Sequence, residues 1–146
     1  MIAALRINTV PLDYDRPVAA PILRAYDASG RTLDNPTDVE VHDLFADLNA
    51  RCPFAVVERL DREPTDQFYF QIHLDYDGDR NADADKEVDI DYDVEYRDGG
   101  PDRHYKARIT DLYGFAGLDL VYKVYRAWRA EDPELAHLLS WQVWTP

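Results

Sequence analysis

The sequence predicts an α+β fold, with an antiparallel β-sheet of about five to six strands and two main helices packed on one face. Two observations carry this prediction. Apolar and polar residues alternate in the middle of the chain, and apolar stripes at helical spacing lie on either side of it. The chain has 146 residues, the length of one typical domain. We therefore expect residues 1–146 to form a single domain.

The strand predictions rest on period-two alternation. Apolar residues from Phe68 to Leu74 alternate with polar ones, as they do when one face of a strand is buried. A second alternation covers residues 88–96, and residues 105–109 are typical of a further strand. We expect these three strands to form an antiparallel meander, because short loops suffice to connect them. Shorter extended segments are expected at residues 2–10, 22–26, 31–33, 55–60 and 140–144.

Two helices are predicted, the first by its start signal and the second by its apolar stripe. Thr37 and Glu40 have the spacing of a capping box, in which each side chain binds the backbone N–H of the other residue. The apolar positions that follow, up to Leu48, fall on one helical face. The second helix begins near Gly117, and its apolar stripe extends to Trp128.

The charge balance is the unusual feature of the composition. Sixteen basic residues face twenty-nine acidic ones, so the net charge is −13 and the isoelectric point is about 4.5. Phosphates would repel such a chain, which argues against a general binder of nucleic acid or of anionic membranes. A salt-rich cytoplasm or a GC-rich genome also favours Asp and Arg over Lys, and is the alternative explanation of this composition. Either would spread the acidic residues evenly, whereas here they are clustered.

No targeting or membrane segment is expected. No apolar run approaches the ~20 residues of a membrane span. Arg6 follows the first apolar residues too early for a signal peptide. The expected location is the cytoplasm.

The sequence shows no catalytic or cofactor motif. Cys52 is the one cysteine, which excludes an internal disulfide framework and a cysteine-rich zinc site. The four histidines are scattered, and neither of the two serines lies in a Gly-x-Ser-x-Gly motif. We therefore expect a protein that is not an enzyme, with no catalytic residues, no cofactor and no metal site.

The most informative segment is a run of alternating acids that we call the acidic ladder: Glu87, Asp89, Asp91, Asp93 and Glu95. In a strand all five carboxylates point to the same side, about 7 Å from one another. That spacing is close to the distance between successive phosphates of a nucleic-acid strand. The ladder is either an ordinary solvated face or a surface for a basic partner. We favour the partner surface, because solvated faces usually mix acids with Lys, Thr and Arg.

The loop before the ladder is also acidic. Carboxylates stand at positions 1, 3, 5 and 9 of a stretch that resembles the calcium loops of EF-hands and integrin-type hairpins: Asp75, Asp77, Asp79 and Asp83. Those loops usually have Gly at the position of Arg80. We therefore interpret the segment as an acidic hairpin tip that adds to the partner surface, and keep calcium binding as an alternative.

Aromatic residues accompany the acids. Trp141 and Trp144 have opposite parity on the last expected strand, which favours one buried and one presented side chain. We assign Trp144 to the partner surface. Exposed aromatic rings beside carboxylates anchor Arg and Lys by stacking and cation–π contact.

From Thr37 onward, the order of the elements resembles immunity proteins of bacterial polymorphic toxin systems, notably those that neutralise nucleic-acid deaminase toxins. The resemblance covers residues 37–146: an acidic capped helix over Asp38–Leu48, the pair Pro53-Phe54, a strand meander, a late helix, and a closing strand at Leu139–Trp141. It implies a small cytoplasmic inhibitor that occludes a cognate toxin without chemistry of its own.

The leading hypothesis is an immunity-type inhibitor that occludes a basic, nucleic-acid-acting toxin with the acidic ladder, the loop acids and Trp144. Its partner is a basic protein, and it contacts neither nucleic acid nor membrane directly. Two alternatives stay open. A DNA-mimic inhibitor of a DNA-processing enzyme would use the same ladder, and a calcium-binding module would use the acidic loop.

Overall fold

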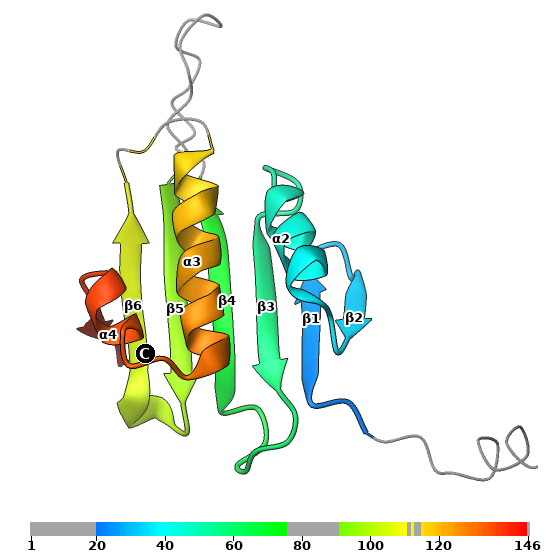
Figure 1. Cartoon of the computed structure of the whole chain (residues 1–146), viewed down its shortest axis with the longest axis vertical. Coiled ribbons are helices and arrows are strands. Elements are labelled where there is room, and N and C mark those ends of the chain that lie inside the picture. The colour runs from blue at the N-terminus through cyan, green and yellow to red at the C-terminus, as the bar shows by residue number, and fades with distance from the viewer. Residues whose placement is uncertain (1–19, 76–90, 111, 113–114, 146) are drawn as a thin grey trace, which may run out of the picture.

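The computed structural model describes residues 20–75, 91–110, 112 and 115–145. These residues form one antiparallel sheet of seven strands, in the order β2-β1-β3-β4-β5-β6-β7, together with three α-helices (Figure 1). The predicted α+β class is confirmed. The strands are β1 (Leu23–Asp27), β2 (Thr32–Asp34), β3 (Phe54–Arg59), β4 (Phe68–Asp75), β5 (Asp91–Asp98), β6 (His104–Ile109) and β7 (Gln142–Val143). The helices are α2 (Asp38–Ala46), α3 (Ala116–Ala130) and α4 (Leu135–Leu138), with a 3₁₀ turn, η1 (Pro101–Arg103), between β5 and β6.

The described residues supply seven strands to the sheet, where the sequence predicts about five to six. The two edge strands, β2 and β7, hold only three and two residues, which is too short for alternation to be recognised. The meander is confirmed, because β4, β5 and β6 are consecutive antiparallel neighbours. The strand expected at residues 2–10 lies outside the described residues.

Both long helices lie on the same face of the sheet. Figure 1 shows α2 over β1 and β3, and α3 over β4 and β5. The apolar half of each strand alternation faces the helices, so that Phe70, Ile72 and Val94 are fully buried. From α3, Val124 and Trp128 join the same core cluster. Burial of each large apolar side chain contributes ~1.5–3 kcal/mol to folding.

An aromatic cluster joins the two helices to the sheet. The ring of Tyr125 in α3 meets Phe45 of α2 edge-on, with 5.5 Å between ring centroids. It also meets Phe70 of β4 at 5.6 Å. Aromatic pairs of this kind add ~0.5–1.5 kcal/mol each beyond their buried area. Tyr125 is therefore the contact point of α2, α3 and β4.

The predicted capping box begins α2. The Thr37 hydroxyl accepts the backbone N–H of Glu40 at 3.1 Å, and the Glu40 carboxylate accepts the backbone N–H of Thr37 at 3.0 Å. Two N–H groups that the first helical turn cannot pair are thereby satisfied.

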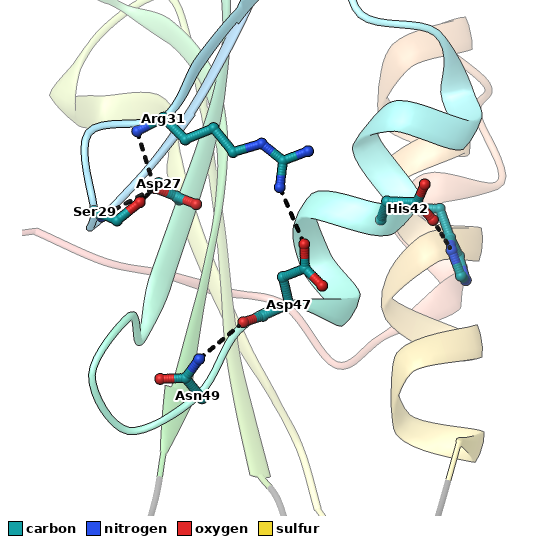
Figure 2. A network of polar contacts seen from close by, with 7 residues as sticks. Asp27, Ser29, Arg31, His42, Asp47 and Asn49 are labelled. Carbon is teal, nitrogen blue, oxygen red and sulfur yellow. Dashed lines mark hydrogen bonds and ion pairs between the residues drawn. The ribbon is translucent and has the colours of Figure 1, made fainter.

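A polar network ties the β1–β2 turn to the end of α2 (Figure 2). The buried carboxylate of Asp27 accepts the backbone N–H and the hydroxyl of Ser29, at 2.9 and 2.6 Å, and the backbone N–H of Arg31 at 3.2 Å. Burial acts to raise the pKa of Asp27, but these hydrogen bonds outweigh it and hold the pKa below its usual value. Arg31 in turn pairs with Asp47 at 3.0 Å, just past α2. The network links the hairpin to the end of the helix.

The Tyr125 hydroxyl provides a test of this core. It is buried and finds no hydrogen-bond partner among the described residues, and burial raises its pKa to about 12. Removing an unpaired buried hydroxyl recovers its desolvation cost, so Tyr125→Phe should leave stability unchanged or raise it by about 1 kcal/mol. Urea unfolding measures the change. The matched control is Tyr122→Phe, one turn earlier and only half-buried, with an expected change within about 0.5 kcal/mol. A loss above about 1 kcal/mol for Tyr125→Phe would show that the hydroxyl is bonded.

Candidate functional site

The candidate site is the second face of the sheet, which we call the open face. Among the described residues no helix packs on it, since α2 and α3 both cover the other side (Figure 1). It carries the polar half of each strand alternation, and most of its side chains are half-buried or exposed. The described part of the acidic ladder lies here.

The strand register sets acids of β5 opposite bases of β6. Asp93 is the direct neighbour of Arg108, and Glu95 is the direct neighbour of Lys106. On the other side of β5, Asp75 at the end of β4 is the neighbour of Asp91. Directly paired residues point to the same face, so this arrangement follows from register alone.

Arg108 gathers three carboxylates, which we call the Arg108 cluster. Its guanidinium binds Asp75 at 2.5 Å, Asp91 at 3.1 Å and Asp93 at 3.0 Å. The hydrogen bond to Asp75 is the largest of the effects that raise the pKa of Arg108. Asp91 and Asp93 are only 21% exposed. Three carboxylates share one guanidinium, so the cluster keeps a net charge of −2.

The next ladder residue, Glu95, has different partners. One carboxylate oxygen lies 3.7 Å from the Lys106 ammonium, and the other lies 3.4 Å from Nε2 of His104. Glu95 is 18% exposed. The described part of the ladder is therefore a set of cross-strand pairs rather than a row of separate charges.

His104 is buried although it lies on the open face. Only 1% of it is exposed, because the rings of Trp144 and Tyr69 cover it, with centroids 5.0 and 5.9 Å away. Nδ1 of His104 accepts a hydrogen bond from Nε of Arg97 at 3.0 Å. The neutral ring therefore carries its proton on Nε2, toward Glu95. Burial is the main cause that lowers the pKa of His104; Glu95 acts to raise it and Arg97 to lower it further.

The structure brings together five of the residues that the sequence assigned to the partner surface. Asp75, Asp91 and Asp93 meet at Arg108, while Glu95 and Trp144 meet through His104. Trp144 is 39% exposed. The other predicted residues, Glu87, Asp89, Asp77 and Asp79, lie outside the described residues.

Sequence reasoning missed the basic partners of the ladder. His104, Lys106 and Arg108 alternate on β6 and so point to the same side as the acids of β5. This alternation was a usable signal, because two neighbouring strands of a meander with complementary alternating charges favour cross-strand pairing. The burial of His104 had no such local signal.

The described part of the site consists of carboxylates paired with cationic side chains of β6. No group of three or more His, Cys, Asp or Glu side chains among the described residues is placed to hold a metal ion. Two surface pockets lie away from the open face. One, of about 500 Å³, lies along α3 and α4, and the other, of about 260 Å³, lies between α3 and the end of the sheet. Neither is lined by a Ser, Cys or His side chain.

No protein-family model, no curated protein and no solved structure matches the chain. Within the described part of the chain, no helix has both the length and the apolar character that crossing a membrane requires.

His104 makes stability depend on pH. Its pKa in the folded protein is lower than the ordinary value of about 6.5, so its contribution is complete above that pH and is lost as the pH falls below it. One such group changes the free energy of unfolding by at most about 1.4 kcal/mol per pH unit. We expect His104→Phe to reduce the loss of stability between pH 7.5 and pH 5.5, measured by urea unfolding.

The matched control for this prediction is His73→Phe, because His73 is exposed on the same face. It makes the same substitution on the same face while leaving the imidazole of His104 in place. Equal pH dependence in the wild type and in His104→Phe would show that the buried imidazole is not the titrating group.

Proposed function

We propose that the chain is an immunity-type inhibitor, a binding protein that occludes a basic, nucleic-acid-acting toxin with its open face. The proposal places it in the cytoplasm, without chemistry of its own. The observation that carries it is the Arg108 cluster, with a net charge of −2 on a face that no described helix covers. A toxin that acts on nucleic acid needs a basic cleft to hold phosphates, and such a cleft complements this face.

The pairing of the three carboxylates with Arg108 favours binding of a basic partner rather than opposing it. Asp75, Asp91 and Asp93 are each held by the guanidinium, so their side chains are ordered before a partner arrives. Ordering side chains at an interface otherwise costs ~0.5–1.5 kcal/mol each. An Arg or Lys of the partner would meet fixed acceptors that carry excess negative charge.

The net charge of −13 favours fast association with a basic partner. At the other end of the described ladder, Trp144 offers a partly exposed ring beside Lys106, whose ammonium lies 5.9 Å from the ring centroid. Aromatic residues of this kind are enriched among the residues that dominate binding energy. The open face thus combines acids with an aromatic anchor.

The two alternatives have less support. A DNA mimic needs evenly spaced, separate charges, whereas Arg108 draws three carboxylates together. Calcium binding at the acidic loop needs Asp75, which pairs with Arg108 at 2.5 Å. A calcium ion would have to displace that guanidinium.

The first experiment is capture of the tagged protein's partner from the source lysate, in the presence of a calcium chelator. We expect a single basic toxin domain to be retained and its activity on nucleic acid to be inhibited by the pure chain. Retention of a DNA-processing enzyme would favour the mimic. Retention that requires calcium would favour the calcium module.

The second experiment tests whether the open face binds the partner. The triple variant Asp91→Asn, Asp93→Asn and Glu95→Gln should weaken binding of the captured partner by about tenfold or more, mainly through slower association at low salt. The matched control removes three exposed acids from the helix side, by Asp43→Asn, Asp119→Asn and Glu134→Gln. Both triples change the net charge equally. Equal weakening by the two would contradict a specific role for the open face.

A further inference from the structure

The last strand of the sheet, β7, is attached by few contacts. It has two residues, and both are exposed. It pairs with β6 only at Tyr105 and Lys106. Just past β7, the backbone N–H of Trp144 donates to the carbonyl of His104 at 2.8 Å. Segments with few buried contacts open at a low free-energy cost. We therefore expect β7 to separate from β6 more readily than the longer strands separate from one another.

The ring of Trp144 lies over a buried imidazole. His104 is only 1% exposed, and the centroids of the two rings are 5.0 Å apart. The second ring over His104, Tyr69, belongs to β4, which is paired on both sides with β3 and β5. Tyr69 therefore cannot leave without disrupting the middle of the sheet. Opening of β7 is the motion that admits water to His104 at the least cost.

A second proton on the imidazole has no acceptor in this arrangement. Nδ1 of His104 accepts a hydrogen bond from Nε of Arg97 at 3.0 Å. A proton on Nδ1 would direct two donors at each other, because the guanidinium has no acceptor. The hydrogen bond would be lost, and two positive charges would stand at that distance instead.

The charged groups around the imidazole also oppose a second proton. Glu95 of β5 brings a carboxylate oxygen to 3.4 Å from Nε2 of His104, but it is already paired with Lys106 of β6 at 3.7 Å. Arg97 is the second cation, and Tyr69 stays neutral because burial raises its pKa further above the physiological range. A protonated His104 would thus be the third cation around one carboxylate, at a position closed to water.

We propose that β7 and Trp144 form a pH-sensitive latch, which is closed over the neutral imidazole of His104 and opens when that ring takes up a second proton. In the open arrangement water reaches the imidazolium and hydrates its charge. Loss of the proton lets Trp144 return to the ring. We call this segment the Trp144 latch.

The Trp144 latch is a property of the free chain and does not depend on the proposed function. If the proposed function holds, opening of the latch removes Trp144 from the open face. It also leaves a positive charge beside Glu95. Both changes weaken the binding of a basic partner as the pH falls.

The titration of a hydrated imidazole sets the size of the effect. An exposed histidine has a pKa of about 6.5, and burial lowers the pKa of His104 while the latch is closed. The proton therefore binds the open arrangement more tightly. Between pH 7.5 and pH 5.5, the ratio of open to closed molecules should rise about three- to tenfold.

Hydrogen exchange of the Trp144 amide tests the latch in the full chain. Opening of β7 frees this N–H, so its protection factor should fall about three- to tenfold between pH 7.5 and pH 5.5. The protection factor is taken relative to the intrinsic exchange rate at each pH. The matched control is the Leu60 amide beyond β3, which donates to the carbonyl of Ile22, also at 2.8 Å. An equal fall at both amides would assign the effect to the whole sheet and contradict a latch.

Two substitutions remove the titrating ring. His104→Phe keeps an aromatic side chain beneath Trp144, and His104→Asn keeps an acceptor for Arg97. In either variant the protection factor of the Trp144 amide should change less than about twofold over the same pH range. His73→Phe, at an exposed position of the open face, should keep the wild-type fall. A fall that persists in both His104 variants would overturn the proposal.

Nuclear magnetic resonance of the wild-type chain tests the same coupling without a substitution. The indole N–H of Trp144 should shift as the pH falls, with the same midpoint as the ring protons of His104. The indole N–H of Trp141 donates to the carbonyl of Leu135 at 2.8 Å and is the reference that should not follow this titration. A Trp144 resonance that does not follow the titration of His104 would also overturn the proposal.

The latch and the proposed function fail separately. Opening of the Trp144 latch at low pH, together with equal weakening of partner binding by the open-face and helix-side triple variants, would support the latch and contradict the proposed function. A Trp144 amide whose protection does not depend on pH, together with selective weakening by the open-face triple variant, would reject the latch and support the proposed function.

Discussion

Among the described residues, helices cover only one side of the sheet, and the rest of this structure depends on that constraint. The helix face can be apolar throughout, and Phe70, Ile72 and Val94 are fully buried there. The other face carries every second residue of the same strands and has to be stable against water. Acids placed there repel one another unless bases stand opposite. Arg108 and Lys106 of β6 meet that requirement.

The pairs on the open face do more for register than for stability. Exposed ion pairs contribute about 0–1 kcal/mol each, which is little beside the burial of one large apolar side chain. A slip of one residue between β5 and β6 would turn Asp93 into the core and Val94 out of it. The charge pairs and the apolar pattern therefore select the same register, and Arg108 extends that selection to β4 through Asp75.

The sequence predicts what local spacing determines. Period-two alternation identified β4, β5 and β6, and the spacing of Thr37 and Glu40 identified the start of α2. The partners of the ladder could not be predicted with equal certainty, since they depend on the register across the turn at η1. The burial of His104 could not be predicted from the sequence. The ring that covers it belongs to Trp144, which lies forty residues further along the chain. A histidine at a polar position of a strand gives no local sign of such burial.

Among the described residues, β7 pairs with only part of β6, and the net charge bears on which strands approach that edge. An uncovered strand edge pairs readily with any other edge, including that of a second copy. Two copies of this chain each carry −13, so their mutual approach is opposed by repulsion that a basic partner does not meet. The net charge of the chain therefore disfavours self-pairing at β6. Specificity is a difference between two affinities. Under the proposed function, the attraction of a basic partner and the repulsion between two copies of the chain both come from the same acidic residues.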